Sequence, residues 1–262
     1  MQALRTAATG MSAQQTNVEV ISNNIANMNT IGFKKQRAEF QDLLYQTVEQ
    51  QGAQSSNQGT IVPTGVQIGA GVKSGSVYRI STQGALTQTG NQYDLAINGR
   101  GYFQVLLPSG DTAYTRAGNF SVNDQGQLVT QDGYQVQPAI SIPQTATSVA
   151  IDQSGDVQVT VPTSTTPTTV GQLQLVTFMN EGGLSAQGGN LFLETGASGA
   201  PVTGTAGALG FGTLMQGYTE ASNVDPVTEI TSLIVAQRAY EMNSKVITTA
   251  DNMLQVANQV KQ

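Results

Sequence analysis

The side chains that could do chemistry in this 262-residue chain are mainly carboxylates, because the sequence contains neither cysteine nor histidine. This composition excludes thiolate metal sites, disulfides and nucleophilic machinery built on Ser-His-Asp or Cys-His. One Asp/Gly turn unit occurs twice with the same spacing, at 122–128 and 151–157. Each copy supplies too few carboxylates for a dedicated calcium site, and hairpin turns favour Asp and Gly anyway. We therefore expect no metal and no other cofactor.

Paired aspartates could also cleave glycosidic bonds. A carbohydrate-active β-protein needs two positioned carboxylates in a cleft and usually aromatic platforms for the sugar. This chain has no tryptophan, and its acids stand mostly in turns. We therefore expect no enzyme and no catalytic residues, and the carbohydrate-active reading stays a remote alternative, as does a phage-tail-like tube or adhesin.

Charge is sparse and unevenly placed. Charged residues make up 11% of the chain, with 17 acids against 11 lysines and arginines, and the acids concentrate in the middle. An acidic middle disfavours nucleic acid and anionic membrane as partners. No run approaches the roughly 20 apolar residues of a membrane span, and the first fifteen residues lack the apolar core of a cleaved secretory signal. We expect no membrane insertion and, if the protein leaves the cytoplasm, another export route.

The first element that the sequence predicts is a helix near the amino terminus. Between residues 4 and 28 apolar side chains recur seven apart, which places them on one helical face. The first row consists of Leu4, Met11, Val18 and Ile25. An ordinary amphipathic helix packing on its own domain and a coiled-coil seam both fit this row.

The carboxy-terminal end repeats the pattern at greater length. From Asn223 a helix of about 35 residues is expected, with Pro226 in its first turn and a 3.5-residue apolar period. Its seam includes Leu233, Tyr240, Asn243, Ile247 and Leu254. At about 1.5 Å per residue such a helix is roughly 50 Å long and must project from a small domain. One amino-terminal helix covers only one side of it, so we expect polymerisation through the termini.

The segment 22–37 ends the first helix in a cluster of asparagines. Asn23, Asn24, Asn27 and Thr30 weaken a helix because their side chains compete for nearby backbone groups. Gly32 can adopt the left-handed conformation that closes the helix, and Phe33 can pack back on the last turn. These polar groups exceed what a cap needs, so we expect some to bond to other segments or other subunits.

The middle of the chain alternates short apolar runs with turns, which predicts an antiparallel β domain and an α+β fold. Strands are predicted at 76–80, 94–97, 102–107, 112–116, 119–122, 127–130, 134–137, 148–151, 156–161, 171–178, 191–194 and 213–219. A short amphipathic segment is predicted at 34–44. The polar stretch 46–65 reads as a flexible linker, although it is long for one. Residues 161–170 are interpreted as a Thr/Pro spacer and 195–212 as a surface loop.

Two long patterns at opposite ends resemble the terminal signatures of bacterial flagellar rod and hook proteins: SNNIANMNTIGFKKQR and NVDPVTEITSLIVAQRAYEMNSKVITTADNML. The positions that carry this motif are Asn23, Asn24, Asn27, Thr30, Gly32, Phe33, Gln237, Arg238, Tyr240 and Glu241. Residues 42–72 are most similar to the distal rod members of that family. The resemblance assigns rigidity of the shaft to an extended stretch at 46–63, including Gln46, Gly52, Gln54, Ser55 and Pro63.

The resemblance implies a structural polymer. Such subunits form a helical tube around an export channel, with terminal helices inside and the β domain outside. The distal rod acts as a drive shaft that carries motor torque to the hook. The implied partners are further copies of the chain, proximal rod proteins, the hook protein, the peptidoglycan-ring and outer-membrane-ring proteins, and the export apparatus.

The implied location is the flagellar basal body, from the periplasm to the outer membrane, reached without a cleaved signal peptide. The alternative within the family is a proximal rod or short hook-type subunit, which the stretch 46–63 disfavours. The expected domains are residues 1–32 with 224–262 as a helical, coiled-coil-like polymerisation domain, 33–72 as a connecting domain, and 73–223 as the outer β domain.

Overall fold

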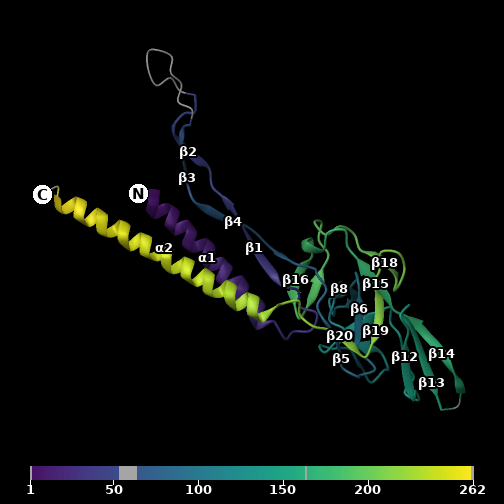
Figure 1. The fold of residues 1–262 in the computed structure, drawn as a ribbon. Coiled ribbons are helices and arrows are strands. Elements are labelled where there is room, and N and C mark those ends of the chain that lie inside the picture. The colour runs from purple at the N-terminus through teal and green to yellow at the C-terminus, as the bar shows by residue number, and fades with distance from the viewer. Residues whose placement is uncertain (1, 53–63, 163, 261–262) are drawn as a thin grey trace. The chain divides into compact units, whose positions relative to one another are not determined.

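The computed structural model describes residues 2–52, 64–162 and 164–260 (Figure 1). The chain divides into two compact units. We call Met1–Ile25, Gln36–Tyr78 and Pro226–Gln262 the helical unit, and Ala26–Lys35 and Arg79–Asp225 the β unit. The chain therefore passes from one unit to the other four times, and both of its ends belong to the helical unit.

The helical unit contains the two predicted helices. Helix α1 spans Gln2–Ala26 and helix α2 spans Pro226–Val260, which gives α2 the expected 35 residues. Pro226 occupies the first position of α2, where its missing N–H leaves no helical bond unmade. Neither helix is long and apolar enough, within the part of the chain that the structure describes, to cross a membrane.

A two-stranded ribbon completes the helical unit. Strand β1 (Gln36–Asp42) pairs with β4 (Val72–Arg79), and β2 (Tyr45–Glu49) pairs antiparallel with β3 (Val66–Gly69). The predicted amphipathic segment at 34–44 is thus mostly strand. Backbone bonds from Leu43 N to Gly71 O, 2.8 Å, and from Ala70 N to Leu44 O, 3.1 Å, join the two pairs into one ribbon. Residues 45–49 and 66–69 are therefore paired strands. The reading of 46–65 as a flexible linker does not hold for these residues, in line with the extended stretch that the resemblance implies.

The β unit is built from short antiparallel strands. A seven-stranded sheet has the order β16-β17-β8-β7-β11-β10-β9, and a three-stranded sheet has the order β12-β13-β14. The seven-stranded sheet contains β7 (Phe103–Leu106), β8 (Thr112–Thr115), β9 (Ser121–Val122), β10 (Leu128–Val129), β11 (Gln135–Gln137), β16 (Ser185–Gly188) and β17 (Leu191–Leu193).

The other strands of the β unit form the three-stranded sheet and three pairs. The three-stranded sheet contains β12 (Ser148–Ile151), β13 (Asp156–Val161) and β14 (Ser164–Gln172). The pairs join β15 (Gln174–Thr177) to β18 (Val202–Thr205), β19 (Thr213–Gln216) to β6 (Leu95–Asn98), and β20 (Tyr218–Glu220) to β5 (Leu86–Gln88). A 3-10 turn, η1, spans Glu181–Gly183.

Two regions interpreted as irregular are strands. The Thr/Pro spacer contains β14, which pairs with β13; threonine favours strands, and Pro167 is tolerated because β14 lies at the edge of its sheet. The expected surface loop at 195–212 contains β18, held by Val202↔Thr177 through Thr205↔Gln174. The strand expected at 213–219 divides at Gly217, whose φ of 75° interrupts the extended backbone.

Two apolar cores stabilise the β unit. The larger one is drawn from many strands and includes Leu95, Phe103, Val157, Leu175 and Leu214, all at most 1% exposed. The smaller core is aromatic: Tyr102, Tyr114, Phe178 and Phe192 meet edge to face at centroid distances of 4.8–6.1 Å. The α+β class and the antiparallel middle are confirmed.

Candidate functional site: assembly surfaces and a buried ionic cluster

Helices α1 and α2 contact each other at two levels. Asn24 Nδ2 donates to Glu229 Oε2 over 3.1 Å, and both residues are buried. Further along, Gly10 lies against Asn243, because a Cβ at position 10 would come within 2.8 Å of Asn243 Nδ2. A later residue of α1 thus lies opposite an earlier residue of α2. The two helices therefore run antiparallel, side by side (Figure 1). Gly10 makes room for the polar seam residue Asn243.

The predicted seam residues are only partly covered. Leu4, Met11, Val18 and Ile25 of α1 and Leu233, Asn243 and Ile247 of α2 are half-buried, whereas Tyr240 and Leu254 are 43% and 39% exposed. Fully buried positions are mostly small or β-branched: Ala7, Ala13, Val20, Ile21, Ala236 and Ala250. In a single chain the larger seam side chains are therefore partly exposed to solvent.

A second apolar stripe of α2 has no cover in the described part of the chain. It consists of Val235, Met242, Val246 and Met253, which are 47% to 63% exposed. These positions are seven, four and seven residues apart, so they share one helical face. Large contiguous apolar surface on a helix marks an interaction site.

The joint segment, Ala26–Lys35, follows α1 and belongs to the β unit. Gly32 has the predicted left-handed backbone, with φ of 71°, and a Cβ there would lie 2.7 Å from Ala117 N. Its N–H donates to Glu220 O over 2.8 Å. Asn190 Nδ2 donates to Ile31 O over 2.8 Å, which adds a second tie to the strands. The joint segment therefore docks on the β unit through backbone groups.

The asparagines of the motif have different partners. Asn24 Nδ2 donates to Gln36 O and its Oδ1 accepts from Gln36 N, both at 2.8 Å, so Asn24 does bond to other segments as expected. Asn27 Oδ1 accepts from Thr30 Oγ1 over 3.1 Å, which is local turn bonding. Phe33 is half-buried, and its N–H donates to Thr30 O over 3.3 Å.

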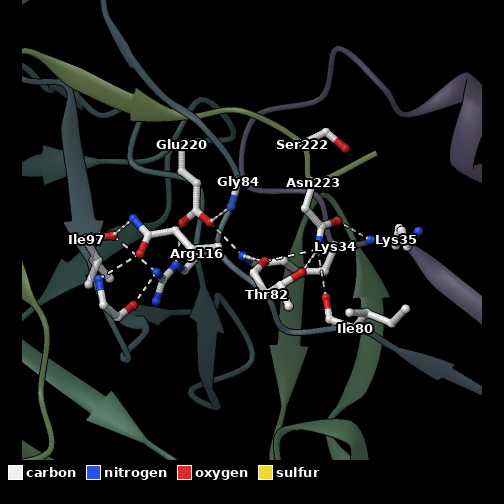
Figure 2. Close-up of polar contacts among 12 residues, drawn as sticks. Lys34, Lys35, Ile80, Thr82, Gly84, Ile97, Arg116, Glu220, Ser222 and Asn223 are labelled. Atoms are coloured by element: carbon white, nitrogen blue, oxygen red, sulfur yellow. Dashed lines mark hydrogen bonds and ion pairs between the residues drawn. The ribbon is translucent and has the colours of Figure 1, made fainter. Parts of the chain in front are cut away.

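A buried ionic cluster connects Lys34 of the joint segment with Arg116 and Glu220 of the β strands (Figure 2). Glu220 Oε1 accepts from Lys34 Nζ over 2.6 Å and from Gly84 N over 2.8 Å, and its Oε2 accepts from Arg116 Nε over 2.5 Å. The side chains of Glu220, Lys34 and Arg116 are 0%, 5% and 6% exposed.

The remaining donors of the two cations are satisfied by backbone carbonyls. Lys34 Nζ donates to Thr82 O over 2.8 Å, and the Arg116 guanidinium donates to Ile97 O, Gly99 O and Gly101 O. A buried ion pair is stable only with such additional bonds. The cluster joins residues that are 186 and 104 positions apart in the sequence.

One carboxylate serves two cations, and the pKa directions reflect this. Burial raises the pKa of the Glu220 carboxyl, but the charge of Arg116 and the hydrogen bonds from Lys34 and Arg116 hold it below its ordinary value of 4.5. Burial lowers the pKa of Lys34 below 10.5, and the hydrogen bond and charge of Glu220 offset this only in part. Glu220 is therefore ionised at neutral pH.

Asn223 ties three segments of the β unit together (Figure 2). Its Oδ1 accepts from Lys35 N over 2.7 Å, and its Nδ2 donates to Ile80 O over 2.9 Å and to Thr82. Ile80 N in turn donates to Lys35 O over 2.9 Å. These residues lie near three of the four places where the chain passes between units.

Other surfaces complete the description. The β2–β3 ribbon exposes Leu44, Tyr45, Val48, Val66 and Ile68. Of the predicted rigidity residues, Gln46 lies in β2 and Gly52 follows it with φ of 78°, whereas Gln54, Ser55 and Pro63 lie outside the described residues. A polar pocket of about 410 Å³ in the β unit is lined by Asn29 and Thr30 of the joint segment, among others.

The two Asp/Gly turns bond within themselves. Asn123 Oδ1 accepts from the N–H groups of Gln125 and Gln127, and Ser154 Oγ donates to Asp152 and Asp156. Among the described residues no three acids gather to hold a metal ion.

Sequence reasoning missed Arg116, Glu220 and Asn223. The available signal was charge in an apolar setting: Arg116 follows the strand residues Ala113 to Thr115, and Glu220 ends an alternating run. In a chain with 11% charged residues, a charge within a strand pattern indicates a buried pair.

Three protein-family descriptions match the sequence. Residues 4–34 match the flagella basal body rod protein, residues 96–172 the D1 domain of the flagellar hook protein FlgE/F/G, and residues 215–260 the C-terminal part of the flagellar basal body rod FlgEFG protein. The matches cover both terminal segments and much of the β unit.

Similarity to known proteins extends over the whole length of the chain. The chain is 69% identical to the flagellar basal-body rod protein FlgG of Caulobacter vibrioides over 100% of both chains, and 53% identical to FlgG of Agrobacterium fabrum over 98% of both. It is 36% identical to the flagellar basal-body rod protein FlgF of Caulobacter vibrioides, over 91% of this chain and 90% of that one.

Proposed function

The chain belongs to the flagellar basal-body rod family and is a structural subunit of the distal rod, not an enzyme, and from this premise we propose that it polymerises into a helical tube through its terminal helices. In that tube α1 and α2 pack in coiled-coil fashion against those of neighbouring copies, and the β unit forms the outer layer. A proximal rod or hook-type role is not favoured. This chain is 69% identical to the FlgG protein of Caulobacter vibrioides but only 36% identical to the FlgF protein of the same organism.

The uncovered stripe of α2 carries this proposal. Val235, Met242 and Val246 remain 60%, 63% and 47% exposed although α1 already lies along the helix. Full burial of such a side chain stabilises by about 1.5–3 kcal/mol. Neighbouring copies that cover the stripe would supply this stabilisation at each α2.

The β2–β3 ribbon supports contact between copies in a second place. An isolated two-stranded ribbon is at best marginally stable in water. Here Leu44 is 90% exposed and Val48 is 65% exposed, so the ribbon offers apolar side chains for a neighbour to cover. We assign to the extended stretch 46–63 the role of stiffening the tube.

The tube would act as a drive shaft. It would carry motor torque from the proximal rod proteins through the peptidoglycan and outer-membrane rings to the hook, and its channel would connect to the export apparatus that delivers the subunits without a cleaved signal peptide. The sparse charge of the β unit suits a surface that turns inside a ring, because three of its five cations, Lys34, Arg100 and Arg116, are paired with its own acids.

Electron microscopy of the purified protein under polymerising conditions tests the proposal. Straight hollow tubes are the expected product. Curved or supercoiled tubes would indicate a hook-type subunit, and a persistent monomer at concentrations above about 100 µM, where interfaces of standard size are saturated, would contradict the proposal.

Deletion of residues 46–63 sharpens the test of rigidity. We expect this variant to polymerise but to give tubes that bend, with a persistence length at least several-fold shorter on micrographs. Replacing the same residues with a Gly/Ser chain of equal length is the matched control, because it keeps the connection without the native side chains. Straight tubes from both variants would show that residues 46–63 do not stiffen the tube.

A further inference from the structure

A groove opens between α1 and α2 at the level of the carboxy-terminal sequence motif. It has a volume of about 440 Å³ and is lined by Gln15, Val18, Gln237, Tyr240 and Glu241. All five residues belong to the helical unit. The described part of the chain places no side chain of its own across this groove.

The lining fits a long cationic side chain. Val18 and the ring of Tyr240, which is 43% exposed, offer an apolar wall for an aliphatic stem, and the ring face also attracts a cation. The Glu241 carboxylate and the amide of Gln237 supply acceptors for the charged head. An arginine suits this combination best, because its planar guanidinium stacks on an aromatic ring while it bonds a carboxylate.

Glu241 has no cation partner within the described residues of its own helix. Spacing alone predicts pairs of Glu241 with Arg238, three residues before it, and with Lys245, four residues after it. Neither ion pair forms in the structure of residues 226–260, and Arg238, Glu241 and Lys245 are all exposed. The groove acid and the nearest cation therefore remain available for partners outside the chain.

Arg238 lies at the axial level of the groove but does not line it. The contacts of Asn24 with Glu229 and of Gly10 with Asn243 place Gln15 of α1 opposite about residue 238 of α2. At about 100° per residue, Arg238 points roughly 160° around α2 from the buried Ala236. One copy thus carries an acceptor groove beside α1 and, at the same height, a cation that points away from Ala236 and lies about 60° further around α2 than Glu241.

We propose that the groove of Gln15, Val18, Gln237, Tyr240 and Glu241 receives Arg238 of a second copy of this chain. The contact is heterologous, since groove and arginine are different surfaces, and such contacts repeat from copy to copy. It sets the lateral register of α2 helices and brings the Val235–Met253 stripe of one copy towards its neighbour. The inference rests on the proposed polymerisation and names one ion pair within it.

Single charge reversals test the contact in the full chain. In R238E a glutamate would face Glu241 of the neighbour, and in E241R an arginine would face Arg238 of the neighbour. Each variant alone should raise the critical concentration for polymerisation at least about tenfold, because like charges opposed in an interface are costly. Far-UV circular dichroism should show unchanged helix content, since both side chains are exposed. K245E is the matched control and should polymerise like the wild type.

Mixing the two variants separates contacts between copies from contacts within a helix. In an equimolar mixture of R238E and E241R chains that alternate along the polymer, the introduced glutamate of one variant faces the introduced arginine of the other. At the next contact the native Arg238 of the second variant meets the native Glu241 of the first, so polymerisation should recover to within about threefold of the wild type. A pair formed within one helix would be rescued in the double variant R238E/E241R but not by mixing.

The outcomes keep this inference apart from the proposed function. Wild-type tubes together with impaired single variants and rescue by mixing support the contact. Wild-type tubes with unimpaired single variants, or with rescue in the double variant alone, overturn the contact and leave polymerisation standing. Failure of the wild type and of K245E to polymerise at all would count against the proposed function itself.

Discussion

The two units of this chain differ in how far they bury their own side chains. In the β unit Phe103, Val157 and Leu175 are completely buried, and the cluster around Glu220 is closed to solvent. In the helical unit α2 leaves Met242 and Met253 more than 60% exposed. The β unit thus buries its apolar and charged interior, whereas the helical unit leaves apolar side chains of α2 exposed.

This difference separates what the folding of one chain buries from what it leaves exposed. Every buried side-chain nitrogen or oxygen in the described residues has a hydrogen-bond partner, so folding leaves no polar defect for assembly to repair. In the polymer that we propose, assembly would instead be driven by the apolar area of α2 that one chain leaves exposed. Substitutions in the β unit should therefore act on folding, and substitutions on the free face of α2 should act on polymerisation.

The largest effect is expected from E220Q. The substitution leaves Lys34 and Arg116 buried without a counter-charge, which typically lowers the free energy of unfolding by about 3–5 kcal/mol. Thermal and urea unfolding followed by circular dichroism measure the loss. E181Q is the matched control: its partner Arg100 has a side chain that is 64% exposed, so about 1 kcal/mol or less is expected. Equal losses in the two variants would contradict the central role of the cluster.

The same carboxylate makes stability depend on pH. The pKa of Glu220 in the folded chain lies below the ordinary 4.5, so the folded state binds this proton less readily than the unfolded state. The contribution is complete above the unfolded value and is lost as pH falls through the folded one. E220Q should therefore show a shallower acid limb than the wild type in unfolding free energy measured from pH 7 downward, and parallel limbs would argue against ionised Glu220.

A pair of truncations tests the division between folding and assembly. Leu175→Ala removes a fully buried side chain of the larger core and should lower the free energy of unfolding by about 2–5 kcal/mol. Met242→Ala removes a side chain that is 63% exposed and should change monomer stability by about 0.5 kcal/mol or less while it raises the critical concentration for polymerisation. A destabilised Met242→Ala monomer with normal polymerisation would reverse the comparison.

The fold could be predicted from sequence wherever the signal is periodic or local. The helices followed from apolar spacing, and the left-handed Gly32 followed from a helix-ending pattern. Strands β14 and β18 were missed because threonine, glycine and proline resemble loop composition. Their order comes from pairing with β13 and β15, and a pairing partner is not visible in the strand itself.

The candidate site divides in the same way. The seam positions of α2 follow from the helical period, because a helix repeats its environment every turn or two, and their role in assembly stays a prediction. The cluster of Lys34, Arg116 and Glu220 could not, because its members are brought together only by the packing of strands far apart in sequence. Single buried charges have no period, and their partners are decided by tertiary structure.

A smaller loss of stability than at Glu220 or Leu175 is expected at Asn24, where helix propensity and tertiary bonding compete. Alanine is the better helix former by about 0.7 kcal/mol, yet Asn24→Ala removes both bonds to the backbone of Gln36 and one bond to Glu229 in a site that is 1% exposed. We expect a net loss of about 1–2 kcal/mol and faster hydrogen exchange at Gln36 N–H. Ser22→Ala, on an exposed turn of the same helix, controls for propensity alone. Assembly should suffer in Asn24→Ala/Asn27→Ala, and a fully motile strain carrying that double substitution would reduce both asparagines to helix-ending residues.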